Sequence, residues 1–311
     1  MPQLVSGGKD HPVGTAYWVS AVQAVRRDVS TGRRAPYKPL LLLWMIGRIS
    51  AGLPTRVAFK ESEEPLRELM DDFRLGVRAE PGLPFVHLGA EPELWRVEDA
   101  TGANLYELTD KNKRRRVTYL RENAIGVLAA DFAKALTRQE VLVAVVNAVL
   151  QMEFPETAHE AILAAVGLSG RVQLTPKAKD PQFAATVLLA YEFSCAFCGF
   201  DGRIKGSPVG IDAAHVRMRA HQGPDQISNG VALCALHHRL FDRGVLGLSE
   251  DLRILVSQYF LQSDGGVAYN TKDLLGEPMR RPQGGYEPPA LPHVKWHFQN
   301  LFMEPSRLPG S

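Results

Sequence analysis

The cysteines of this sequence all lie after residue 190, and their spacing is that of metal ligands. Cys195 and Cys198 form a Cys-x2-Cys pair that Gly199 follows, and Cys234 and His237 form a second x2 pair further along the chain. Each short pair can chelate from one turn, and a distant second pair closes a tetrahedral Zn²⁺ site. We therefore predict a structural zinc ion bound by these four side chains. The alternative is three buried cysteines that bind nothing.

A second set of polar residues lies inside the zinc loop and at its closing edge. His215 comes first, Asn229 follows, and His238 stands directly after the second zinc pair. Three segments carry the two sets: CAFCG, DAAHV and SNGVALCALHHRLFDRG. Together they resemble the HNH, or ββα-metal, nuclease family, and the resemblance covers residues 185–260. A zinc-clipped DNA-binding protein without catalysis is the alternative, and it would leave these three residues idle.

The HNH resemblance implies hydrolysis of phosphodiester bonds. That reaction needs a water deprotonated near neutral pH, a cation on the scissile phosphate and stabilisation of the leaving oxygen. The family pattern makes His215 the general base at the end of a strand, because histidine titrates near that pH. Asn229 would orient the base and shape the loop. His238, on the following helix, would hold the catalytic divalent cation, Mg²⁺ or Mn²⁺.

The second ligand of that cation is where the sequence departs from the family. Many HNH enzymes have an acidic residue or a histidine directly before the base, whereas this chain has Ala214. Asp212 is the nearest acid, but residues three apart on a regular strand face opposite sides. We expect Asp212 to be the second ligand if the strand bulges or bends, and a structural hydrogen-bonding residue otherwise. Asp242, four residues after His238, is the reserve candidate, with pairing to Arg243 as its structural alternative.

The N-terminal half contains two basic clusters that could steer DNA. Five basic residues lie between Arg26 and Lys38 against one acid, and five of the six residues from Lys111 to Arg116 are basic. Each cluster could neutralise phosphates in a salt-dependent manner. Solvated surface charge is the alternative reading of both.

The order of the segments resembles one arrangement of restriction enzymes. The N-terminal half contains GRRAPYKPLLLLWMIGR, LPFVHL and LWRVE, and VKWHFQNLF follows the HNH segments. This order is similar to that of the phosphorothioate-dependent type IV restriction endonucleases, in which a sulfur-binding domain precedes the nuclease. The resemblance implies that the chain binds double-stranded DNA in which sulfur replaces a non-bridging phosphate oxygen.

The same resemblance implies a recognition site in the N-terminal domain. Sulfur is more polarisable and less hydrated than oxygen, so an apolar pocket rimmed by cations would favour it, and arginine is also the usual reader of guanine. The alternative for the apolar members is ordinary core packing. The expected DNA-binding residues are Leu83, Pro84 and Phe85 as the pocket, His87 at its edge, and Arg33, Arg34 and Tyr37 for charge and hydrogen bonds.

The elements around these residues indicate an α+β protein of two domains. The chain has 311 residues, of which 45% are hydrophobic and 23% charged, and this balance excludes a disordered, collagen-like or coiled-coil chain. We predict a mixed helical and short-strand DNA-recognition domain over residues 1–165, a linker over 166–180 and a zinc-stapled HNH domain over 181–311. Helices are expected over 15–29, 39–50, 61–75, most of 119–152 and 181–193, a strand over 54–60, and a hairpin or short strands over 76–97.

Charge and cysteine use limit the cellular setting and the partners. The formal net charge is only +2, so a DNA partner is indicated by the local clusters and not by bulk charge. Three cysteines make no disulfide framework, and we see neither a secretory signal nor a membrane span, so we expect a cytoplasmic protein. Double-strand cutting from one HNH site per chain suggests a homodimer or two successive events. The rival function is an HNH endonuclease that reads a methylated base or a plain sequence.

Overall fold

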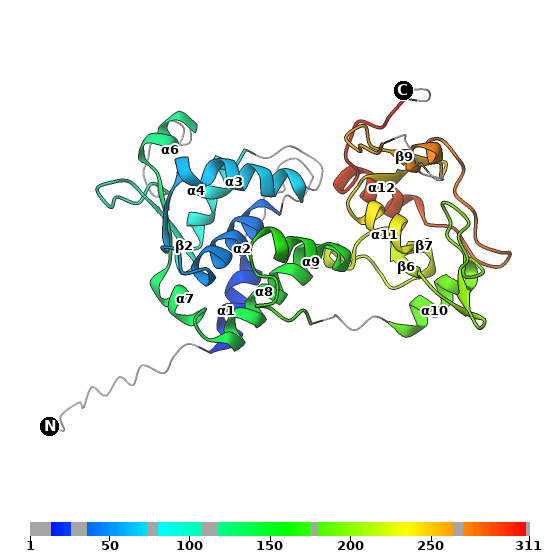
Figure 1. The fold of residues 1–311 in the computed structure, drawn as a ribbon, viewed down its shortest axis with the longest axis horizontal. Coiled ribbons are helices and arrows are strands. Elements are labelled where there is room, and N and C mark those ends of the chain that lie inside the picture. Colours follow the sequence, from blue (N-terminus) through cyan, green and yellow to red (C-terminus); the bar gives the residue numbers. More distant parts are fainter. Residues whose placement is uncertain are drawn as a thin grey trace, which may run out of the picture.

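Two hydrophobic cores divide the chain (Figure 1). The computed structural model describes residues 14–25, 36–73, 80–106, 117–175, 180–263 and 270–308. The first core runs from Trp18 to Val172 and the second from Phe183 to Val294. Both units mix helices with short antiparallel strands. The α+β, two-domain prediction is therefore confirmed.

The N-terminal domain wraps helices around a three-stranded sheet of order β1-β3-β2. Helix α2 is apolar on most of its surface, and Leu40 to Leu43 are all buried because α3, α4 and α8 pack around it. Burial of each such leucine contributes about 1.5–3 kcal/mol. The elements are α1 (Thr15–Ala24), α2 (Tyr37–Ser50), β1 (Arg56–Ala58), α3 (Phe59–Asp72), α4 (Gly82–His87), η1 (Leu88–Ala90), β2 (Trp95–Glu98), α6 (Val117–Asn123), β3 (Ile125–Leu128), α7 (Ala130–Ala135), α8 (Gln139–Glu153) and α9 (Glu156–Ala165).

One expected element of this domain was wrong, and a stretch that is mostly helical as expected is interrupted by a strand. The segment from Leu83 to Leu88 forms helix α4 and a 3-10 turn in place of a strand, because Pro84 in the first helical turn needs no N–H partner there. The stretch expected to be mostly helical contains β3, the central strand of the sheet. Gly126 on β3 allows this packing, since a Cβ there would lie 2.1 Å from the Trp95 ring.

Buried residues of the first core continue past residue 165. Leu168 and Val172 are buried in the first core, whereas residue 166 was expected to begin the linker. We therefore propose a boundary between residues 172 and 180, with α10 as the first element of the second domain. Among the residues that the structure describes, no helix is long and apolar enough to cross a membrane.

The C-terminal domain is built on an antiparallel strand pair and the helix that follows it. Strands β6 and β7 pair without interruption from Ile211–Cys234 to His215–Gly230, and α11 starts directly after β7 and packs on both strands. The elements are α10 (Pro181–Ala190), β4 (Arg203–Ile204), β5 (Ser207–Pro208), β6 (Ile211–His215), η2 (Arg219–His221), η3 (Ile227–Asn229), β7 (Gly230–Cys234), α11 (Ala235–Asp242), β8 (Leu246–Leu248), β9 (Ile254–Val256), η4 (Thr271–Leu274) and α12 (Leu291–Asn300).

The two domains meet through the last helices of the first domain. Helix α9 packs against α11, and α8 packs against the 3-10 turn η2 (Figure 1). A second contact lies at the end of α3, where Arg243 donates a 2.7 Å hydrogen bond to the carbonyl of Asp72 and stacks 5.0 Å above the Phe73 ring. Helix α11 is thus held from both sides, by its own strands and by the other domain.

Candidate active site

The four predicted zinc ligands converge on one point. The Sγ atoms of Cys195, Cys198 and Cys234 and a ring nitrogen of His237 all lie within 4.8 Å of one another. The Nδ1 atom of His237 is 3.4 Å from Cys195 Sγ and 3.2 Å from Cys234 Sγ. Ligands at about 2.3 Å (sulfur) and 2.0 Å (nitrogen) from one tetrahedral zinc would be about 3.5 Å apart. The cluster therefore has the chemistry and spacing to hold a zinc ion.

The thiols of this cluster also influence one another electrostatically. Hydrogen bonds from the Cys198 and Cys234 thiols lower the pKa of Cys195, while the same contacts raise the pKa of Cys198. The Cys195 thiolate is thus favoured beside the Cys198 thiol. A bound divalent cation replaces those protons and deprotonates the coordinating thiols.

The general base candidate, His215, is the last residue of β6 and lies between two partners. Its Nε2 atom is 2.6 Å from the Oδ1 atom of Asp225, and its ring stacks on Phe183 at 4.2 Å with an interplanar angle of 22°. Because a carboxylate only accepts hydrogen bonds, Nε2 carries the proton and Nδ1 is the basic nitrogen of the neutral ring. Burial lowers the pKa of His215, and the Asp225 hydrogen bond opposes that shift.

Asn229 holds the loop beside the base. Its side chain is fully buried; Oδ1 accepts from the backbone N–H of Arg217, and Nδ2 donates to the carbonyls of Arg217 and Pro224. This clamp fixes the residue before Asp225, and Asp225 is the partner of His215. Gly223 lies inside the clamp, where a Cβ would be 1.8 Å from the Arg217 carbonyl oxygen. The described contacts of Asn229 thus shape the loop and reach the base through Asp225.

His238 lies between two carboxylates. Its Nδ1 atom is 3.2 Å from Asp212 Oδ2, and its Nε2 atom is 3.4 Å from Asp242 Oδ2. The β6–β7 register is regular, so β6 has no bulge. Asp212 lines a separate hollow beside Arg239, while Asp242 lines the same cavity as His215 and His238. Asp212 thus contacts His238 from a regular strand, and its role as a metal ligand stays a prediction.

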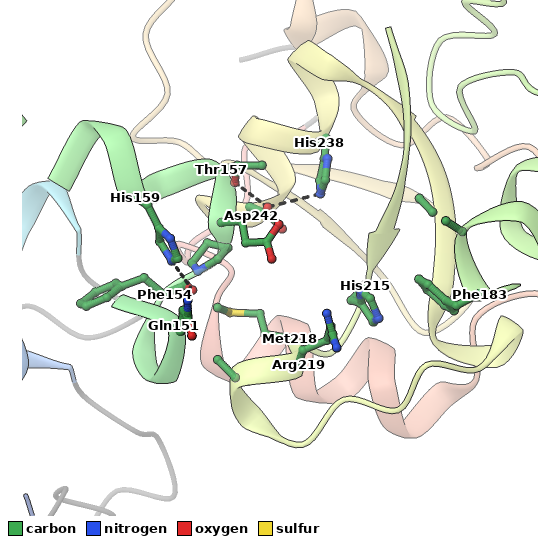
Figure 2. A pocket seen from close by; sticks show the side chains of 15 residues that line it. Gln151, Phe154, Thr157, His159, Phe183, His215, Met218, Arg219, His238 and Asp242 are labelled. Atoms are coloured by element: carbon green, nitrogen blue, oxygen red, sulfur yellow. Dashed lines mark hydrogen bonds and ion pairs between the residues drawn. The ribbon is translucent and has the colours of Figure 1, made fainter. Parts of the chain in front are cut away.

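The cavity between the two domains contains these groups (Figure 2). Its volume is about 100 Å³. The side chains of His215, His238 and Asp242 are only 16%, 10% and 8% exposed. Thr157, on α9 of the other domain, has its Oγ1 2.5 Å from Asp242 Oδ2. Figure 2 shows α9 and α11 presenting these two side chains to each other across the cavity.

Sequence reasoning found the histidines of this site and missed two of their partners. His215 and His238 line one cavity, as the HNH pattern implies. Asp225 was not singled out, although its place in the turn Gly-Pro-Asp just before Asn229 offered a signal. Thr157 offered no sequence signal, because it is distant in sequence and belongs to the other domain.

The expected DNA-recognition residues are only partly placed. Arg33, Arg34 and the cluster from Lys111 to Arg116 lie outside the described residues. Tyr37 begins α2 and is half-buried, and His87 ends α4. Figure 1 places α2 and α4 in the same domain, where they pack together.

The apolar residues of that expected site differ in their exposure. Phe85 is fully buried, with its ring edge-on to Phe59 and Trp95, and Pro84 is buried as well. Their side chains pack in the core of the domain, and their part in DNA recognition stays a prediction. Leu83, which is 50% exposed, is the member of the trio that can contact a ligand.

Comparisons with known proteins separate the chain into the same two parts. Residues 16–171 match the family described as ScoMcrA-like, DNA sulfur-binding domain, and residues 195–249 match the HNH endonuclease family. No curated protein matches the chain.

Several solved structures are similar at low identity. The sulfur binding domain of SprMcrA complexed with phosphorothioated DNA is 22% identical, with a TM-score of 0.43, over 51% of this chain and 96% of that chain. The sulfur binding domain of ScoMcrA complexed with phosphorothioated DNA is 23% identical, with a TM-score of 0.41, over 50% and 98%. The type IV phosphorothioation-dependent restriction endonuclease ScoMcrA is 19% identical, with a TM-score of 0.38, over 68% and 43%.

Proposed function

Since this chain belongs to the family of the ScoMcrA-like DNA sulfur-binding domain and its C-terminal part is an HNH endonuclease domain, we propose that it is a type IV restriction endonuclease. It binds phosphorothioated double-stranded DNA through the first domain and hydrolyses phosphodiester bonds nearby through the second. The observation that carries the proposal is the union, in one chain, of a sulfur-binding family match with a cavity that gathers His215, His238 and Asp242.

The reaction begins with a proton transfer to His215. Asp225 accepts the hydrogen bond from Nε2, so Nδ1 is the nitrogen that takes the proton from the attacking water. Burial keeps the ring neutral and ready to accept that proton, and the Asp225 carboxylate stabilises the imidazolium that forms. Phe183 restricts the ring to one orientation. One such site cuts one strand, so a double-strand break needs a second copy of the chain or a second event.

His238 and Asp242 are the residues that would hold the catalytic cation. Their facing atoms are 3.4 Å apart, less than twice the roughly 2.1 Å bond of Mg²⁺ to oxygen, so one ion can contact both. The Asp242 carboxylate is a ligand that suits Mg²⁺ and Mn²⁺, and His238 would add one imidazole nitrogen. The cation, when bound, neutralises charge on the scissile phosphate and the leaving oxygen. Asp212 then accepts the Nδ1–H of His238 and orients its ring, as second-sphere carboxylates do for metal-binding histidines.

Exchanging each carboxylate for its amide distinguishes the two acids. Asp242→Asn should abolish Mn²⁺ binding at the catalytic site, whereas Asp212→Asn should weaken it about 10- to 100-fold, because only an orienting contact is lost. Calorimetric titration of the zinc-loaded protein with Mn²⁺ measures both. A larger loss of Mn²⁺ affinity in Asp212→Asn than in Asp242→Asn would indicate that Asp212 is the metal ligand.

The structural cation is proposed to be Zn²⁺, because three thiolates and an imidazole at tetrahedral spacing suit it better than oxygen-preferring ions. It closes the loop that carries β6 and the base. The catalytic cation, by contrast, has one nitrogen and one oxygen ligand from the protein. The two sites therefore select different metals although His237 and His238 are neighbours.

For recognition, we retain Arg33, Arg34, Tyr37 and His87 as proposed DNA contacts, and Leu83 as the apolar contact to sulfur. Leu83 is half-exposed on α4, the helix that packs on the start of the buried α2 run. An exposed apolar side chain offers no donor to reward oxygen, so it favours the weakly hydrated sulfur. Arginine contacts to phosphate act on both kinds of duplex and fix the register.

A binding comparison tests the proposed function. The full-length His215→Ala protein, which retains the DNA-binding residues, should bind a phosphorothioated duplex about 10- to 150-fold more tightly than the same duplex with oxygen, corresponding to about 1.5–3 kcal/mol of apolar burial. The comparison is made at two salt concentrations, because contacts to the phosphate backbone weaken as salt rises. Equal affinities at both would favour the methylated-base or plain-sequence reading.

Leu83→Asn is the matched probe of the sulfur contact. It should reduce the ratio of affinities for the phosphorothioated and unmodified duplexes to near one, while the affinity for the unmodified duplex stays unchanged. Leu53, exposed to nearly the same degree at 47%, provides the control, and Leu53→Asn should preserve the preference. Loss of preference in both variants would mean that the substitutions act through general destabilisation.

A further inference from the structure

The nuclease site is covered by the DNA-recognition domain. We define the seam as Asp72, Phe73 and Thr157 of the first domain together with Asp242 and Arg243 of the second. Thr157 donates to Asp242 at 2.5 Å, and Arg243 donates to the Asp72 carbonyl at 2.7 Å while lying 5.0 Å above the Phe73 ring. The Thr157 contact holds α9 against α11, and the Arg243 contacts hold the end of α3 against the residue that follows α11.

The space between the two domains at this site is too small for the substrate. The cavity has a volume of about 100 Å³, well below the roughly 300–1,000 Å³ of pockets that enclose a drug-sized ligand. Its walls come from both domains, with Phe154 and Pro155 opposite Phe183 and Met218. A general base must come within hydrogen-bond reach of the attacking water at a phosphodiester, and a duplex backbone cannot enter while these walls are in place.

The covering helix also has the wrong charge for DNA. Glu156 and Glu160 on α9 are exposed and line the hollow next to the site, beside Asp212 and Arg239. A phosphate backbone approaching α11 along this side meets carboxylates of the same sign. The closed arrangement therefore opposes cleavage by shape and by charge.

We propose that this arrangement is a resting state in which the recognition domain shields the nuclease site, and that engagement of modified duplex opens the seam. The proposal rests on the proposed function, since it names the regulation of that site. A duplex that contacts both domains can bind only the open arrangement, so it shifts the population toward it. Unmodified DNA, which the first domain binds weakly, leaves the seam closed and is spared.

The test combines Thr157→Val with Arg243→Ala, which remove the two side-chain contacts of the seam. The matched control combines Thr137→Val with Arg253→Ala. The side chains of both residues donate hydrogen bonds only to described groups of their own domain. The first readout, without DNA or catalytic metal, is the rate at which diethyl pyrocarbonate modifies His215, followed by mass spectrometry. The second is cleavage of an unmodified duplex.

We expect both rates to rise about tenfold or more in the seam variant and to stay unchanged in the control, because hydrogen bonds to a carboxylate and from a guanidinium are lost. Thr157→Ser, in the Arg243 wild-type background, keeps the hydroxyl and should behave as wild type. His215 labelling equal to wild type in the seam variant would overturn the proposal, and so would faster labelling without faster cutting of unmodified DNA. If no form of the protein cuts any duplex, the proposed function fails, and the labelling rates alone still decide whether α9 shields the site.

Discussion

His215→Ala should abolish cleavage of phosphorothioated DNA while the protein stays folded and binds the duplex as tightly as wild type. Loss of a positioned general base typically slows a reaction by about 10² to 10⁴-fold, or roughly 3–5 kcal/mol of barrier. His215 ends β6, and its side chain stacks on Phe183 and contacts Asp225; it belongs to neither hydrophobic core, so we expect the fold to tolerate its removal. Single-turnover cleavage in Mg²⁺ and in Mn²⁺ measures the effect. Near-wild-type rates in either metal would overturn the assignment.

Asp225→Asn tests the partner of the same histidine. Burial lowers the pKa of His215, and the Asp225 hydrogen bond opposes this shift only in part. Without the carboxylate the pKa of His215 falls again, so the ring remains neutral to lower pH and the acid limb of the rate profile moves toward lower pH. The maximal rate falls at the same time, because the imidazolium loses its counter-charge. A rate profile that moves toward higher pH would contradict the role given to Asp225.

Cys198→Ser should remove the bound zinc and unfold the C-terminal domain. Structural zinc in small domains contributes apparent free energies of about 10–16 kcal/mol, more than the whole stability of a typical domain. The first domain has its own core from Trp18 to Val172, so it should stay folded. Elemental analysis of the purified protein and hydrogen exchange resolved by peptide measure the two effects.

The control for the zinc variant is Ser194→Ala. Ser194 precedes the first zinc pair and its hydroxyl makes only a 3.3 Å contact with the Glu192 carbonyl. This variant should keep one zinc per chain and a protected β6–β7 pair. Folded, zinc-free wild-type protein after chelation would show that the four side chains do not hold a structural metal.

The sequence predicted the nuclease domain better than the recognition domain, and the physical reason is local. Cys195 with Cys198 and Cys234 with His237 are chelating pairs whose spacing within one turn already implies their geometry. The alternation rule likewise predicts that Asp212 and His215 face opposite sides of a regular strand, and the β6–β7 register is regular. Such short-range patterns survive because one turn or one strand determines them.

The remaining features depend on contacts that no short segment determines. The run from Leu83 to Leu88 has strand-like composition, but Pro84 and the packing of Phe85 between Phe59 and Trp95 make it a helix. β3 is formed because β1 and β2 pair with it from both sides. The contact between Thr157 and Asp242 joins residues 85 positions apart, and only the docking of the two domains creates it.

The adjacency of His237 and His238 at the start of α11 has a consequence for how this domain can vary. Successive helical residues point about 100° apart, since a turn contains 3.6 residues. One histidine is therefore anchored in the thiol cluster while the next is directed toward Asp242. A single inserted or deleted residue between Cys234 and His238 would rotate the second ring by that angle and remove it from the cavity. Related chains should accept many substitutions along α11 but no change of length at its first turn.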